Sequence, residues 1–212
     1  MNNKHAPITE RIYNEITQSK KDIFLNADTN KKSYKKSSDN MVASIFRKHI
    51  INILNYYGYE YRVSNVNAYI KGYPTEWDLV ILNSNAVDHN NNVYDVNDVK
   101  AVFEFKANGL YVIHKEYDEF FKEEFDSRFN ILNSINNTYK NIIPFGYITY
   151  KEQPKLYEAT KKYFDEKNNQ NNTTFVFANS NKYDNDKEIS YEKCCFDLNN
   201  NFEEYLFKLL RL

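Results

Sequence analysis

The stretch Val99–Lys106 constrains the fold of this 212-residue chain more than any other segment. It is apolar at most positions, and half of its residues are β-branched or aromatic, which predicts a β-strand. Because side chains alternate along a strand, Glu104 and Lys106 point to one face of it. Phe103 and Phe105 point to the other face. Burying charged groups near the end of an apolar strand costs free energy, so the Glu-x-Lys pair indicates either a structural salt bridge or part of a functional site.

The rest of the chain alternates helical and strand-like patterns. Helix starts, apolar spacing and turn residues predict helices over residues 8–25, from 37–39 to Gly58, and over 115–136, 155–167 and 202–212. Strands are expected over residues 59–64, 67–71, 77–82, 144–150 and 173–178, with loops at 26–38 and 83–98. This order favours an α/β fold, a central mixed β-sheet flanked by helices.

Composition sets the broad class. With 42% hydrophobic residues the chain can bury a real core, and its length suits one domain with an N-terminal appendage. We expect a helix and Lys-rich loop at residues 1–37 and an α/β domain at 38–212. A net charge of −1 argues against a protein that coats nucleic acid non-specifically. It argues less against an enzyme that holds nucleic acid through a metal and a local basic patch.

The cysteines and the distribution of apolar residues indicate the cellular compartment. Cys194 and Cys195 are adjacent, which fits neither a disulfide framework nor a Cys-x-x-Cys metal site, so reduced thiols are expected. The first residues contain no apolar segment of the secretory type, and no apolar run approaches the length of a membrane span. A soluble, cytoplasmic protein that does not enter a membrane is expected.

A lysine cluster lies in the first expected loop, at Lys31, Lys32, Lys35 and Lys36. The favoured interpretation is a solvated loop. The functional alternative is a patch that contacts phosphate groups, because clustered lysines attract a polyanion even when the net charge of the chain is near zero.

The expected strand before Val99 carries an acid, Asp78, near its beginning. If the two strands pair, Asp78, Glu104 and Lys106 come together at one edge of the sheet. Two carboxylates can hold a hard cation such as Mg²⁺ or Mn²⁺, with waters completing the coordination. The backbone carbonyl of Phe105 is a candidate third ligand. A nearby lysine can orient or deprotonate a water molecule and neutralise developing negative charge.

At Glu76-Trp-Asp78-Leu-Val-Ile and Phe103-Glu104-Phe-Lys106 the chain resembles the PD-(D/E)xK nuclease superfamily. The resemblance covers about half of the chain. It implies a restriction-endonuclease-like core, in which a helix is followed by a three-strand meander, a helix and a strand. It further implies that Asp78 and Glu104 bind the metal and that Lys106 is the catalytic lysine. Many members also carry an acid on the first helix, and Asp39 is the match here.

The expected function is therefore metal-dependent hydrolysis of phosphodiester bonds in DNA, of the restriction or repair endonuclease type. Enzymes that cut both strands often act as dimers, so a homodimer is one candidate state. A non-catalytic module with the same fold, binding nucleic acid or a protein, is the alternative. A structural α/β protein that assembles through a ring-rich surface is a weaker third. Glu76 is favoured as a solvent-facing residue over an extra ligand, and His49 as a packing residue over a metal ligand.

Overall fold

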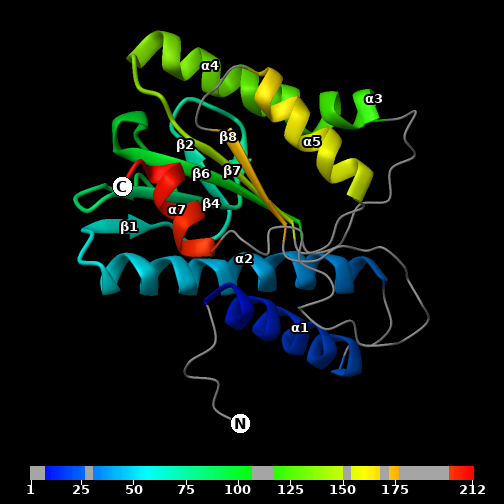
Figure 1. Ribbon diagram of the computed structural model, residues 1–212. Helices are drawn as coiled ribbons and strands as arrows, with labels where there is room; N and C mark the ends of the chain where they lie inside the picture. The colour runs from blue at the N-terminus through cyan, green and yellow to red at the C-terminus, as the bar shows by residue number, and fades with distance from the viewer. Residues whose placement is uncertain (1–7, 27–30, 107–116, 150–153, 168–171, 177–200) are drawn as a thin grey trace.

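The computed structural model describes residues 8–26, 31–106, 117–149, 154–167, 172–176 and 201–212 (Figure 1). The helices are α1 (Ile8–Asn26), α2 (Lys31–Tyr56), α3 (Tyr117–Phe121), α4 (Ser127–Tyr139), α5 (Pro154–Glu166) and α7 (Phe202–Leu210). The strands are β1 (Tyr61–Val63), β2 (Ala68–Ile70), β3 (Glu76–Trp77), β4 (Leu79–Asn83), β5 (Val93–Tyr94), β6 (Val99–Lys106), β7 (Phe145–Thr149) and β8 (Asn172–Val176). Within these ranges no helix has the length and apolar character needed to cross a membrane.

Five strands form the main sheet, in the order β1-β4-β6-β7-β8. The pairs β1–β4 and β4–β6 are antiparallel, whereas β6–β7 and β7–β8 are parallel. The expected fold class, a mixed sheet flanked by helices, is confirmed. Along the chain α2 is followed by β1, β4 and β6, then by α3 and α4, then by β7. This is the core order that the resemblance implied.

Helices cover both faces of the sheet (Figure 1). On one face α1, α2 and α7 pack over Leu79, Phe103 and Phe105 in one apolar cluster. On the other face α3, α4 and α5 pack over Val80 and Val102 in a second cluster. The alternation expected along β6 is therefore confirmed from Ala101 onward, because Ala101, Phe103 and Phe105 enter one core and Val102 enters the other. Val99 also enters the second core, next to the register shift of the β4–β6 ladder.

A smaller sheet of order β3-β2-β5 differs from the expectation for this region. The segment expected as one strand over residues 77–82 is divided, with Trp77 in β3 and the main-sheet strand starting at Leu79. The expected loop at 83–98 contains β5 and a 3₁₀ helix, Val96–Asp98. Such short strands leave little periodic signal, and they form because β2 supplies a pairing partner on each side.

The loop expected over residues 26–38 is wrong from Lys31 onward. Helix α2 begins at Lys31 rather than at residues 37–39, so the lysine-rich segment is helical. The helix ends as expected, since Gly58 follows it with a φ of +75°. The division at 37/38 falls inside α2, and Ile12 and Ile16 of α1 pack in the same cluster as α2. That division stays a prediction.

The helix expected over residues 115–136 contains a π-helical segment, Lys122–Asp126, between α3 and α4. Buried aromatic side chains recur every four residues through it, at Tyr117, Phe121, Phe125 and Phe129. In an α-helix of 3.6 residues per turn such a row drifts around the axis by about 40° at each step. The wider π turn corrects this drift and keeps the row against the sheet.

Candidate active site

Asp78 occupies the junction between the two sheets, directly after β3 and directly before β4. In the β4–β6 ladder Val80 pairs with Val102 and Leu79 pairs with Phe103. One more step of this register places Asp78 opposite Glu104 on the same face of the sheet. The regular ladder stops here, and the Oδ2 atom of Asp78 accepts a hydrogen bond of 2.6 Å from the Phe105 backbone N–H.

The position of Asp78 changes its acid–base behaviour. Burial of the carboxylate raises its pKa, and the negative charge of Glu104 raises it further. The Phe105 N–H and the cations Lys106 and Arg128 act in the opposite direction, and the net pKa is about 7. Two carboxylates held together at a buried strand end therefore repel each other, and this arrangement favours a bound cation.

Glu104 lies at the centre of the site and is only 5% exposed. Its Oε1 atom accepts a hydrogen bond of 2.8 Å from the Lys106 Nζ atom, the neighbour expected from strand alternation. Its Oε2 atom forms an ion pair of 2.9 Å with the Nη2 atom of Arg128. Each oxygen of this buried carboxylate thus faces a positive charge, which offsets the cost of burying it.

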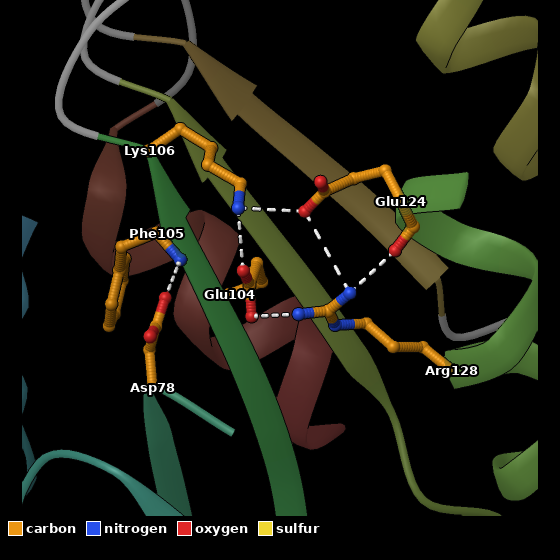
Figure 2. A network of polar contacts seen from close by, with 6 residues as sticks. All are labelled: Asp78, Glu104, Phe105, Lys106, Glu124 and Arg128. Atoms are coloured by element: carbon orange, nitrogen blue, oxygen red, sulfur yellow. Dashed lines mark hydrogen bonds and ion pairs between the residues drawn. The ribbon is translucent and has the colours of Figure 1, made fainter. Parts of the chain in front are cut away.

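Two members of the site were missed by the sequence analysis, Glu124 of the π-helical segment and Arg128 of α4 (Figure 2). The Glu124 Oε1 atom lies 2.7 Å from the Lys106 Nζ atom and 3.8 Å from the Arg128 Nη1 atom. The same Nη1 atom donates to the Glu124 backbone carbonyl at 2.6 Å. An acid and a base four residues apart on a helix normally indicate an exposed ion pair, so the sequence offers no distinguishing signal.

The charges of the network hold Lys106 in its protonated form. Burial alone would lower the pKa of its amine, but the carboxylates of Glu104 and Glu124 more than offset this effect. The pKa of Lys106 is consequently raised above its ordinary value. Its amine is therefore a fixed cation at the end of β6, held by Glu104 and Glu124.

The oxygen donors present suit a hard divalent cation. Mg²⁺ is commonly bound by one or two carboxylates together with waters and substrate phosphates, and Asp78 and Glu104 supply the two carboxylates. The N–H and C=O groups of a strand residue point to the same neighbouring strand. The Phe105 N–H points to Asp78 on the β4 side, so the Phe105 carbonyl faces this side too, where the β4–β6 ladder has ended. Among the described residues no group of three or more His, Cys, Asp or Glu side chains could hold a metal.

The other expected site residues lie elsewhere. Asp39 and the lysines of the cluster belong to the first part of α2, where side chains lie outside the described structure, so their roles stay predictions. Glu76 is exposed in β3 and accepts a hydrogen bond from the Tyr69 hydroxyl. His49 is buried in α2 and bonds to Glu15 of α1 at 2.8 Å. These contacts agree with the favoured interpretations of Glu76 and His49.

No family model matches the chain, and the search of curated proteins gave no match. Among solved structures, the chain is similar to the cAAA-bound form of P. aeruginosa ATCC27853 NucC, with 11% identity and a TM-score of 0.45 over 75% of this chain and 69% of that one. For the cAAA-bound form of E. coli MS115-1 NucC the identity is 11% and the TM-score 0.43, over 78% and 72%. The site assignment therefore rests on its geometry.

Proposed function

We propose that this protein is a metal-dependent nuclease that hydrolyses phosphodiester bonds, with DNA as its substrate. The observation that carries the proposal is the β4–β6 register, which brings Asp78 opposite Glu104 with Lys106 two residues further along the same face. The core order of helix, three antiparallel strands, helix and parallel strand supports it.

The proposed roles follow from the chemistry of each group. Asp78 and Glu104 would hold Mg²⁺ or Mn²⁺, and the Phe105 carbonyl would be a third ligand. When bound, the metal would supply an activated water and neutralise charge on the phosphate. The raised pKa of Lys106 supports a role as a fixed cation that stabilises negative charge on the phosphoryl group, rather than as a base.

The test is incubation of plasmid DNA with the full chain, with and without Mg²⁺ or Mn²⁺. We expect metal-dependent nicking or linearisation, and a loss of at least about 100-fold in Asp78→Asn, Glu104→Gln and Lys106→Ala. Lys100→Ala is the matched control, because Lys100 is an exposed lysine on the same strand. Unchanged metal-dependent cleavage in all three site variants would overturn the proposal.

A catalytically inactive module that binds nucleic acid or a protein partner is the second candidate. The observation that favours it is that both Glu104 oxygens already face cations, Lys106 and Arg128. DNA retention in a mobility-shift assay, without cleavage at any metal concentration, would support this alternative. Binding of neither DNA nor metal would exclude the nuclease.

We also propose an oligomeric state and a cellular location for the protein. A homodimer is proposed because cleavage of both DNA strands requires two active sites or two successive events, and sedimentation of the full chain measures the oligomeric state. A cytoplasmic location would place the protein with its DNA substrate, and fractionation of the source cells tests it.

A further inference from the structure

The Glu104 carboxylate, which the proposed function requires as a metal ligand, is already neutralised by two side chains. The Lys106 amine lies 2.8 Å from one oxygen and the Arg128 guanidinium 2.9 Å from the other. The carboxylate is nearly inaccessible to water, so these interactions are weakly screened. A divalent cation that approaches Glu104 meets two positive charges that already hold both of its oxygens, so its binding competes with theirs.

Both cations also face Glu124, but the Lys106 amine already bonds its Oε1 atom at 2.7 Å, whereas Arg128 still has a contact with that carboxylate to gain. Its Nη1 atom already donates to the Glu124 backbone carbonyl at 2.6 Å, and the Glu124 carboxylate lies 3.8 Å from the same atom. That separation is longer than a hydrogen bond, so a small movement of the guanidinium would close it. Figure 2 shows Arg128 between the two carboxylates, with Glu104 on the strand side and Glu124 on the helix side.

The present arrangement also leaves hydrogen-bonding capacity unused. Among the described residues the buried Nε atom of Arg128 has no hydrogen-bond partner. A guanidinium has five N–H donors, and a buried donor without a partner costs free energy. Glu124 belongs to the π-helical segment, a type of irregularity that is frequent at functional sites.

We propose that Arg128 is a resident counter-ion of Glu104, which leaves it when a metal binds and moves to the Glu124 carboxylate. Glu124 and Arg128 are then positioning residues. Arg128 compensates the buried Glu104 charge in the metal-free protein, and Glu124 receives the displaced guanidinium. The inference rests on the metal site of the proposed function and adds a competition between an arginine and the metal for one carboxylate.

The test measures Mn²⁺ binding to the full chain by calorimetry, without DNA. Arg128→Gln removes the competitor, and we expect the Kd for Mn²⁺ to fall by about tenfold. Glu124→Gln removes the receiving carboxylate, and we expect the Kd to rise several-fold. Glu123→Gln is the matched control, because Glu123 is the exposed neighbour of Glu124 in the same segment, and its Kd should equal that of the wild type.

Two further variants separate displacement from a simple through-space effect of charge. Arg128→Lys keeps the positive charge but lacks the planar fork that bridges two carboxylates. We expect it to bind Mn²⁺ more tightly than the wild type, whereas a charge effect alone leaves the Kd unchanged. In the Arg128→Gln background, Glu124→Gln should weaken binding less than it does in the wild type.

The outcomes distinguish this inference from the proposed function. If the wild type and all variants bind no Mn²⁺, the metal site itself is absent and both proposals fail. If the wild type binds Mn²⁺ and Arg128→Lys binds it no more tightly, Arg128 is not displaced from Glu104 and only this inference fails. Binding in the Arg128 variants but not in the wild type supports the inference. Arg128→Lys retains most of the packing and tests it even where Arg128→Gln does not fold.

Discussion

The two faces of β6 bury their side chains by different means. On the face toward α2, Phe105 stacks on Phe46 with ring centroids 4.9 Å apart and Phe103 stacks on Phe105 at 6.0 Å. On the face toward α4, Glu104 and Lys106 are held by the Glu124–Arg128 pair. Residues adjacent in the chain therefore belong to a packed apolar core and to a network of charges. Substitutions on the first face should change stability, and substitutions on the second should change function.

The largest expected effect on stability comes from Phe105→Ala. The ring is 2% exposed and its removal leaves a cavity, so we expect a loss of about 3–5 kcal/mol in the free energy of unfolding. Urea denaturation measures it. Lys100→Ala on the same strand should stay within about 0.5 kcal/mol of the wild type. A loss below about 1 kcal/mol for Phe105→Ala would contradict a close-packed face.

A second test adds volume to the same face instead of removing it. A Cβ atom at Gly146 would lie 2.6 Å from the Cδ1 atom of Phe103 and 2.8 Å from the Tyr205 hydroxyl. We expect Gly146→Ala to destabilise the protein by about 1–3 kcal/mol, because a close-packed core has to shift to admit a methyl group.

A double variant is the control for this clash. If contact with the Tyr205 hydroxyl contributes, Tyr205→Phe combined with Gly146→Ala should cost less than the sum of the two single substitutions in urea denaturation. Strict additivity would assign the effect to the Phe103 ring.

On the charged face, Asp78→Asn should abolish the proposed cleavage and yet stabilise the protein. The folded-state pKa of Asp78 is raised from 3.8 to about 7, so the folded protein holds this proton more firmly than the unfolded chain. The stability that Asp78 contributes is present at low pH and is lost as the pH rises through this range. Asparagine resembles the neutral form. At pH 8 we expect a gain on the order of 2 kcal/mol in urea denaturation.

The dependence on pH is the control for Asp78→Asn. The gain in stability should shrink as the pH is lowered toward 4, where the wild-type carboxyl is also neutral. A gain of the same size at every pH would show that titration of Asp78 is not its cause.

The smallest expected effect on stability comes from His49 of α2, and its dependence on pH is opposite to that of Asp78. Burial lowers the pKa of His49 below 6.5, and its bond to Glu15 offsets this in part, while Lys48 and Arg11 lower it further. The unfolded chain therefore binds the proton more readily, and stability is lost as the pH falls below about 6.5. Protonation also creates a charged donor at the buried Nδ1 atom, which has no partner among the described residues.

His49→Gln isolates this contribution, because the glutamine amide can still donate to Glu15. Between pH 7.5 and 5.5 the wild type should lose about 1 kcal/mol more stability than the variant. Thermal unfolding at several pH values measures the difference, and parallel curves would contradict it. The two sides of the sheet would then respond to pH in opposite directions.

The sequence by itself determined much of the core. The alternation along Val99–Lys106 identified the charged pair and its apolar neighbours, and Asp78 was recognised near the start of the partner strand. These predictions were reliable because strand alternation is a local property of the backbone. The start of α2 differs from the expectation because a polar, lysine-rich segment carries no apolar spacing that distinguishes a helix from a loop.

Only the tertiary structure showed that Glu124 and Arg128 also belong to the site. Glu124 and Arg128 form an ordinary pair four residues apart, and nothing local distinguishes it from an exposed one. Phe125 follows Glu124 in the π-helical segment and Phe129 follows Arg128 in α4, and both rings are buried in the cluster against the sheet. That packing brings the pair over the carboxyl end of β6. Glu124 and Arg128 reach the site because the neighbouring aromatic side chains are buried against the sheet. This depends on contacts between segments far apart in the chain, so no local sequence pattern predicts it.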